Sequence, residues 1–312
     1  MGLRRTIRPR ISRNIRDIIE VMFSILDPKG PIAMQEKGLI ITAVSIMLII
    51  VVPVLVALVA VVWKYRAGNK GAKREGNPDD RAKNTSFARE AVWWIFPSII
   101  VAILGVITWK SAHALDPSQA VSSNVKPLTI QVVALDWKWL FIYPQQNIAT
   151  VNFIQFPTGT PLNFELTADG APMNGFWIPQ LGGQEYAMAG MTNQLHLMAT
   201  APGVFTGQAT EINGQGFAGM KFEVKATSQN DFDAWVASVR RSAHPLTLDE
   251  YNNLVEPSQN NPQALYSSVQ ENLYGAIVAK FMAPGMMMSS STPSSSMPDM
   301  QNMPANMPGM KM

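Results

Sequence analysis

The side chains that most often perform redox or metal chemistry are scarce in this sequence of 312 residues. Cysteine is absent, which excludes disulfides, thiolate metal sites and cysteine nucleophiles. Histidine occurs three times, at His113, His196 and His244. Protein metal and haem sites depend mainly on these two residue types. We therefore expect no metal site built by this chain alone, and we expect ordinary polar roles for His113 and His196.

Methionine is the remaining soft ligand, and it is concentrated near the C-terminus. Thioethers can bind Cu(I), and five of them recur there at intervals of three and four residues: Met297, Met300, Met303, Met307 and Met310. The surrounding residues 284–312 are mostly Met, Ser and Pro and cannot build an apolar core. We interpret this segment as a disordered tail, with copper capture as the alternative.

Two long apolar runs predict a pair of transmembrane helices. Residues 39–63 contain no charge, and this length crosses about 30 Å of hydrocarbon as a helix. Pro53 lies inside the run, which membrane helices tolerate. Residues 91–109 are also uncharged and carry tryptophans near both ends, as expected at the two membrane interfaces. The two runs form a helical hairpin, so the flanking parts of the chain lie on the same side.

The charge pattern predicts how the hairpin is oriented. Residues 64–90 hold eight Lys or Arg side chains, and short basic loops stay in the cytoplasm. The C-terminal region is then outside. Residues 1–37 hold another eight Lys or Arg side chains, which fit a cleaved signal, an interfacial helix or a misassigned start codon. No basic patch alternates with aromatic residues, which argues against nucleic-acid binding.

Beyond the hairpin the pattern changes to short strands. From Leu128 onward, runs with alternating apolar residues are separated by Pro- and Gly-containing turns, which is typical of an antiparallel sandwich or barrel. Helical patterns return after Asp231 and Thr247, both candidate N-caps, and over residues 264–282. The predicted divisions are the N-terminal segment 1–37, the hairpin 38–110, the β domain 111–228, the helical extension 229–283 and the tail 284–312.

This order of elements, together with the segment Asp-Trp-Lys-Trp at 136–139, resembles subunit II of the haem-copper oxidases. The resemblance implies a membrane α hairpin of two transmembrane helices, an external all-β cupredoxin-like sandwich and a C-terminal helical extension. In the cytochrome c oxidases of that family, the external domain holds a binuclear copper centre. Its ligands are a His on one loop, followed on a later loop by two Cys, a Glu, a second His and a Met.

The sequence keeps the frame of that copper site and loses most of its ligands. The matching positions, in chain order, hold Asn174, Ala209, Glu211, Asn213, Phe217 and Met220. Ala209 and Asn213 stand at the cysteine positions, and only thiolates bridge a copper pair of this kind. The resemblance therefore implies a site without metal, in which the surviving Glu211 and Met220 have structural roles.

This pattern of loss resembles the quinol-oxidase branch, where electrons arrive from a membrane quinol and no copper relay is needed. Further segments similar to the bo-type ubiquinol oxidases occur from about residue 26 to residue 282, at 26–30, 63–67, 137–144, 178–182 and 186–191. The chain departs from that branch at its N-terminus, where a lipoprotein signal with a cysteine would be expected.

The resemblance also suggests roles for three further residues. Glu90 precedes the second apolar run, at the position of a family glutamate near the mouth of a proton channel, and it could pass protons to the catalytic subunit. The family aromatics that match Trp137 and Trp139 lie near the electron path into that subunit. Without a copper relay, we expect these two tryptophans to pack against the catalytic subunit instead.

Taken together, the resemblance implies a non-catalytic subunit II of a proton-pumping terminal quinol oxidase in an aerobic respiratory chain. The expected partners are catalytic subunit I, the other oxidase subunits and quinol. The complex is expected to carry haems, one copper and ubiquinone, and this chain no cofactor. The expected location is the bacterial plasma membrane, with both termini periplasmic. The alternatives are a cytochrome c oxidase subunit with a degenerate copper site and a membrane-tethered copper-handling protein.

Overall fold

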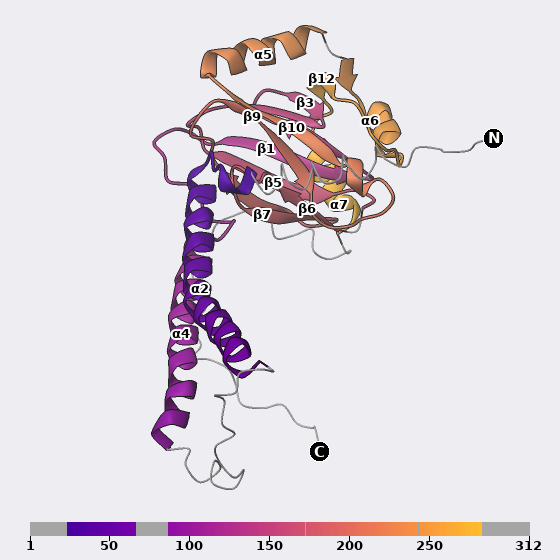
Figure 1. Cartoon of the computed structure of the whole chain (residues 1–312). Helices are drawn as coiled ribbons and strands as arrows, with labels where there is room; N and C mark the ends of the chain where they lie inside the picture. Colours follow the sequence, from indigo (N-terminus) through magenta and orange to yellow (C-terminus); the bar gives the residue numbers. More distant parts are fainter. Residues whose placement is uncertain (1–23, 67–86, 172, 243, 283–312) are drawn as a thin grey trace, which may run out of the picture.

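A computed structural model describes residues 24–66, 87–171, 173–242 and 244–282 of the chain. Two long helices extend in the same direction from one end of a β-rich domain (Figure 1). Most of the predicted N-terminal segment 1–37, most of the basic loop 64–90 and the methionine-containing tail 284–312 lie outside the described residues.

The two helices are α2 (Pro31–Tyr65) and α4 (Phe87–Ala114). Both are long and apolar enough to cross a membrane, and their apolar windows are not buried in the protein. Val59 in α2 and Trp109 in α4, for example, are 65% and 70% exposed. A helix that is apolar on all sides needs lipid or protein around it, so both predicted transmembrane segments are helices of membrane-spanning length and composition.

The β domain is built from two sheets that pack on each other (Figure 1). The strand order is β11-β12-β3-β2-β1-β5-β8 in the larger sheet and β4-β10-β9-β6-β7 in the smaller one. The pairs β1–β5, β4–β10 and β11–β12 are parallel, so the domain is a mixed sandwich and not a purely antiparallel one. The strands up to residue 227 are β1 (Leu128–Leu135), β2 (Lys138–Tyr143), β3 (Ile148–Val151), β4 (Phe153–Pro157), β5 (Leu162–Ala168), β6 (Met173–Trp177), β7 (Gln184–Met188), β8 (Asn193–Leu197), β9 (Gly203–Ala209) and β10 (Lys221–Thr227).

Aromatic side chains fill the space between the two sheets. Trp139 from β2 contacts Phe176 from β6 and Phe222 from β10 at ring-centroid distances of 5.3 and 5.9 Å. Phe176 and Phe222 stack at 5.1 Å, and all three residues are almost fully buried. Strand β10 shows why the sequence folds this way, because its residues alternate between exposed and buried as expected for a strand with one face in a core.

The C-terminal extension contains α5 (Gln229–Ser242), β11 (His244–Leu246), α6 (Leu248–Val255), β12 (Ala264–Val269) and α7 (Leu273–Lys280). Strands β11 and β12 extend the edge of the larger sheet, α6 and α7 cover its other face, and α5 packs against the core between the two sheets. Tyr251, Tyr266 and Ile277 from this extension form a second apolar cluster with Val133 and Leu140 of the sheet. Both faces of the central strands are therefore buried, which explains why all six residues of β2 are buried.

The structure confirms one of three predictions about the extension and differs from the other two. Thr247 caps α6, where its side chain accepts the backbone N–H of Glu250, as predicted. Asp231 is not the cap of α5, because the helix begins earlier and the Ser228 hydroxyl accepts the Asp231 N–H at 3.2 Å. Residues 264–269 form strand β12 and not a helix, because they pair with the edge of β3.

Candidate functional site

The residues that match the copper ligands lie where β6 meets the connection between β9 and β10. The backbone N–H of Thr210 donates to the carbonyl of Gly175 in β6 at 3.0 Å, and that of Ala209 donates to the carbonyl of Met220 at 3.1 Å. A short 3-10 helix, η1 (Phe217–Gly219), closes the connection before β10. These bonds hold residues 210–220 against the first residues of β6.

Three of the predicted positions converge into one buried polar contact. The side-chain amide nitrogen of Asn213 donates to the side-chain oxygen of Asn174 and lies 3.2 Å from the Sδ atom of Met220. Asn174 and Met220 are 0% and 1% exposed. The structure thus brings these two loops together, with a neutral amide bridge at the meeting point.

The other three positions point elsewhere. Ala209 is buried in the core, and Phe217 packs against the edge of that core. Glu211 turns toward β7, where its carboxylate accepts the hydroxyl of Tyr186 at 3.3 Å. The negative charge of Glu211 raises the pKa of the Tyr186 hydroxyl. Glu211 therefore belongs to a surface contact on β7, separate from the amide bridge.

This set of donors does not fit a binuclear copper centre. The converging side chains offer two amides and one thioether, and none of them can supply a bridging thiolate. The Asn213 amide nitrogen is committed to Asn174 and Met220, whereas the Asn174 amide nitrogen and the Asn213 amide oxygen are buried without a hydrogen-bond partner among the described residues. Nor does any group of three or more His, Asp or Glu side chains in the described parts of the chain gather as a metal site.

Comparison with known proteins gives the family. A family model described as the periplasmic domain of cytochrome c oxidase subunit II matches residues 144–227, and one described as the COX aromatic rich motif matches residues 240–285. Cytochrome bo(3) ubiquinol oxidase subunit 2 of Pseudomonas aeruginosa is 51% identical over 258 residues, which cover 83% of this chain and 76% of the relative. The chain belongs to the quinol oxidase subunit 2 family. It is therefore a membrane-bound subunit of a terminal quinol oxidase, and neither the cytochrome c oxidase nor the copper-handling alternative is favoured.

More distant members of the quinol oxidase subunit 2 family show the same extent of similarity. Ubiquinol oxidase subunit 2 of Acetobacter aceti is 43% identical over 86% of this chain and 85% of the relative. Quinol oxidase subunit 2 of Bacillus anthracis is 38% identical over 75% of this chain and 79% of the relative. In each case the similarity thus extends over three quarters or more of this chain.

The two predicted interface tryptophans have different environments in this quinol oxidase subunit. Trp139 is completely buried in the aromatic core, so the prediction that it contacts another subunit is wrong. Trp137 is half-buried and has a positive φ of 63° in the turn between β1 and β2. Its indole covers the glycines of the 210–220 loop, where a Cβ added to Gly216 would lie 2.2 Å from the ring. An interface role for Trp137 stays a prediction.

The remaining predicted residues lie apart from the amide bridge. Glu90 belongs to the first turn of α4, at the end of the helix that is remote from the β domain (Figure 1). The Nδ1 atom of His113 lies 2.9 Å from the carbonyl oxygen of Trp109. The Nδ1 atom of His196 lies 3.2 Å from the carbonyl oxygen of Pro117. Each of these histidines thus has a backbone partner, which agrees with an ordinary polar role.

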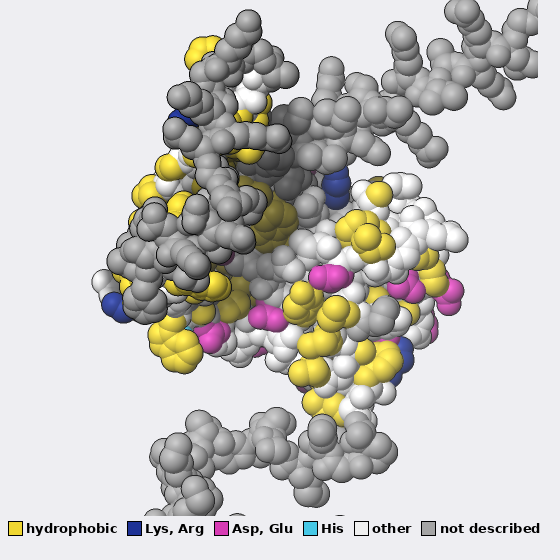
Figure 2. All heavy atoms as spheres, turned by 60° about the horizontal axis from the view of Figure 1, so that its bottom comes forward, with side chains coloured by type: hydrophobic (Ala, Val, Ile, Leu, Met, Phe, Trp, Pro, Cys, Tyr) yellow, Lys and Arg dark blue, Asp and Glu magenta, His cyan; other side chains and the backbone are white. Residues whose placement is uncertain are grey.

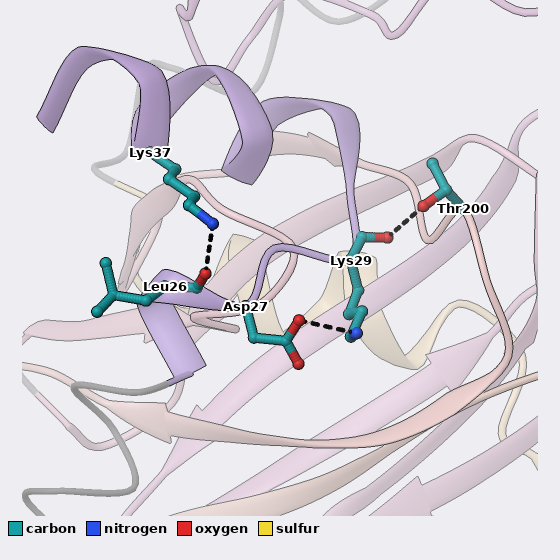
Figure 3. Close-up of polar contacts among 5 residues, drawn as sticks. All are labelled: Leu26, Asp27, Lys29, Lys37 and Thr200. Carbon is teal, nitrogen blue, oxygen red and sulfur yellow. Dashed lines mark hydrogen bonds and ion pairs between the residues drawn. The ribbon is translucent and has the colours of Figure 1, made fainter. Parts of the chain in front are cut away.

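The segment before α2 attaches the membrane hairpin to the β domain, a contact that the sequence did not predict. Figure 3 shows the carbonyl of Lys29 accepting the hydroxyl of Thr200 at 2.8 Å and the amine of Lys37 donating to the carbonyl of Leu26 at 2.8 Å. The Lys29–Asp27 pair at 2.8 Å is solvent-exposed on both sides and adds little. Hydrogen bonds to backbone groups therefore supply most of the attachment between this segment and the β domain.

Loop 178–183 forms the domain side of this junction. The N–H groups of Lys29 and Ala33 donate to the carbonyls of Gln180 and Leu181 at 2.7 and 3.2 Å. The Glu36 carboxylate accepts the N–H of Gly183 at 2.9 Å. Gly182 has a φ of +85°, and a Cβ there would lie 2.5 Å from the Ala33 nitrogen. Segments 26–30 and 178–182, both similar to the bo-type ubiquinol oxidases, are distant in sequence. In the structure they contact each other.

One buried carboxylate links two helices of the aromatic extension to the cupredoxin-like domain. Asp169, at the end of β5, is 1% exposed and accepts hydrogen bonds from the Tyr251 hydroxyl at 2.6 Å and from the Lys280 amine at 2.7 Å. Burial and the neighbouring carboxylate raise the pKa of Tyr251 well above its usual range. Asp169 thus joins α6 and α7 to the β domain. The sequence gives no signal for this role, because its two donors, Tyr251 and Lys280, lie far along the chain.

Proposed function

We propose that this subunit carries no redox centre and that the haems and one copper of the oxidase lie in catalytic subunit I. The observation behind this proposal is the amide bridge between Asn174 and Asn213, which occupies the position of the family copper ligands with groups that cannot hold a copper pair. Electrons then reach subunit I from quinol without a relay in the external domain.

The proposed reaction of the complex is oxidation of ubiquinol coupled to reduction of oxygen to water and to proton pumping. The relatives from Pseudomonas aeruginosa and Acetobacter aceti, which are named ubiquinol oxidase subunits, support this substrate. Ubiquinone was predicted above among the cofactors of the complex. For a quinol oxidase it is a substrate pair with ubiquinol, and we correct the prediction accordingly.

The proposed orientation places the β domain on the periplasmic side of a bacterial plasma membrane. The first turn of α2 and the last turn of α4 both lie at the β domain (Figure 1). The opposite ends are joined through residues 64–90, which hold eight Lys or Arg side chains. Because basic loops stay in the cytoplasm, the β domain is then outside and subunit I lies beside the two helices.

Glu90 is the proposed proton-collecting group at the cytoplasmic surface. It lies in the first turn of α4, at the cytoplasmic end in this orientation. A carboxylate at a membrane boundary can take up protons and pass them on. Glu90→Gln should slow oxygen uptake while the haem content of the complex is unchanged, and Glu90→Asp should retain most of the rate. Equal rates in all three proteins would contradict this role.

The main test is made on the complex purified through a tag on this chain. Oxygen uptake is measured with ubiquinol and with reduced cytochrome c, and copper is quantified per complex. We expect uptake with ubiquinol alone and one copper per complex. Uptake with cytochrome c, or further copper that is lost when this subunit is removed, would overturn the proposal.

A further inference from the structure

The dipeptide Asn-Gly occurs twice in the sequence, at 174–175 and 213–214. The amide bridge brings the two copies together, because the Asn213 side chain donates to that of Asn174. Asparagine is a chemically labile residue, and a following glycine makes it more so, because glycine has no Cβ to keep its backbone nitrogen away from the asparagine side chain. The structure gives the two copies very different surroundings.

The lability of Asn-Gly comes from a reaction within the chain. The backbone nitrogen of the glycine attacks Cγ of the asparagine, so a bond from this nitrogen to Cγ forms and the bond from Cγ to Nδ2 breaks. The amide nitrogen leaves as ammonia and takes the proton of the glycine N–H. Water then opens the cyclic imide at either carbonyl carbon and leaves aspartate or isoaspartate. No enzyme is needed, because the two reacting groups belong to adjacent residues.

The first copy lies inside a sheet and is protected. Asn174 is 0% exposed. Gly175 pairs with Tyr186 of β7 on one side, and on the other side its carbonyl accepts the Thr210 N–H at 3.0 Å. An attack by the Gly175 nitrogen requires the peptide to turn out of the strand, which breaks these contacts and exposes the core. The reaction at Asn174 therefore needs an opening of β6 itself.

The second copy lies in the connection between β9 and η1, outside any strand. Gly214 is exposed and has a φ of +129°, a conformation that residues with a side chain rarely adopt. Its N–H donates to no backbone carbonyl in the described parts of the chain. The attacking nitrogen is therefore available here, and solvent water can reach the glycine.

The amide bridge is the main restraint on the second copy. The Asn213 amide nitrogen donates to Asn174 and lies 3.2 Å from the Sδ atom of Met220, so the side chain has to leave these partners before Cγ can be attacked. The amide oxygen of Asn213 has no hydrogen-bond partner among the described residues and does not add to this restraint. A local opening of the loop is therefore sufficient, which costs less than opening a core strand.

We propose that Asn213 is a site of spontaneous deamidation in the folded protein and that Asn174 is not. The product carries a carboxylate where the amide bridge had its donor. A carboxylate has no proton for the Asn174 oxygen or for the Met220 thioether. The bridge is lost, and a negative charge lies against buried side chains. The modification therefore loosens the 210–220 loop as the protein ages.

The surroundings of this carboxylate offer little positive charge. Strand β6, which carries Asn174, belongs to the lower side of the β domain in Figure 1, and Figure 2 turns this side forward. Among the described residues, Lys and Arg side chains are few and scattered there (Figure 2). The charge formed at residue 213 therefore stays largely unpaired, which adds to the effect of the lost bridge.

Peptide mass spectrometry of the purified oxidase tests the proposal. The complex is incubated at mildly alkaline pH, and samples are digested with chymotrypsin, which cleaves after Leu and Phe and separates the two copies into peptides 167–176 and 206–217. We expect the mass increase of amide loss to appear about tenfold or more faster at Asn213 than at Asn174. In urea both copies should convert at similar rates, because the difference is structural. Conversion at Asn213 that is no faster than at Asn174 in the folded complex would overturn the proposal.

A pair of substitutions measures what the product does to the loop. Asn213→Asp creates the aspartate product directly, and Gln215→Glu makes the same change of charge on an exposed side chain of the same loop. In hydrogen exchange of the full oxidase, we expect the Ala209 and Thr210 amides to exchange about tenfold faster in Asn213→Asp and at the wild-type rate in Gln215→Glu. Wild-type exchange in Asn213→Asp, or equal acceleration in both variants, would contradict loosening through the lost bridge.

Discussion

Replacing Lys280 by methionine should weaken the attachment of α6 and α7 to the β domain without unfolding the domain itself. The Lys280 amine lies 2.7 Å from an Asp169 oxygen, and the Asp169 side chain is 1% exposed. In Lys280→Met the carboxylate keeps only the Tyr251 hydroxyl, at 2.6 Å. Methionine preserves most of the apolar part of the lysine side chain, so the change isolates the lost charge.

The expected magnitude lies between two limits. An exposed ion pair contributes up to about 1 kcal/mol, whereas removing one partner of a fully buried pair destabilises by about 3–5 kcal/mol. Here the carboxylate is buried and the Lys280 side chain is 56% exposed. We therefore expect a loss of about 2 kcal/mol, which corresponds to about a thirtyfold change in the opening equilibrium of the extension.

Native-state hydrogen exchange of the full chain in detergent measures this opening directly. Amides of α6 and α7 should exchange about thirtyfold faster in Lys280→Met, while amides of β1 and β2 should be unaffected. Lys225→Met, on an exposed position of β10, serves as the control. Unchanged exchange in α7, or equal acceleration in β1 and β2, would refute the reasoning.

Three further perturbations test other contacts. Gly216→Ala should destabilise the 210–220 loop by about 1–3 kcal/mol, because its Cβ would lie 2.2 Å from the Trp137 ring, and faster exchange of that loop checks this. Gly182→Ala should open the junction with Ala33 and speed exchange of the Ala33 amide, whereas Gly170→Ala, which has the same φ of +85° in open space, should leave that amide unchanged. Burial lowers the pKa of Lys138, so the unfolded chain binds more protons there and stability should rise as the pH increases toward 10.5. Melting temperatures of wild type and Lys138→Met across this range should show a flatter slope in the variant.

Each of these grouped predictions has an outcome that contradicts it. Equal exchange of the 210–220 loop in Gly216→Ala would mean that the indole moves aside freely. Equal effects of Gly182→Ala and Gly170→Ala would show that backbone strain, and not the contact with Ala33, decides the result. If the melting temperatures of wild type and Lys138→Met change with pH in parallel, burial does not shift the pKa of the Lys138 amine.

The hairpin and most strands could be predicted because their signals are local. Uncharged runs and alternating residues report directly on the surroundings of each segment, as in β10. Strands β6 and β7 gave no such signal, since Gly175 and the polar Asn174 and Gln184 interrupt the alternation. Strand β12 was predicted as a helix. Its extended conformation depends on pairing with β3, which lies more than one hundred residues earlier in the chain.

The candidate site was predictable in position but not in geometry. Family spacing located Asn174, Asn213 and Met220, and the structure brings these three together. The sequence could not show that Glu211 points away toward Tyr186, because that depends on β7 lying beside β6. Trp139 was assigned to an interface because tryptophan is common there, although the sheet register places it inside the core.

The covering of the larger sheet on both faces sets an order of events during biosynthesis. All residues of the outer face of β1 and β2 have been synthesised once residue 143 is made. The side chains that cover this face include those of α7, which ends at Lys280. The ribosome adds about 5–20 residues per second, so this apolar sheet surface stays uncovered for about 7–27 s during synthesis. Truncation before α7 would make the exposure permanent.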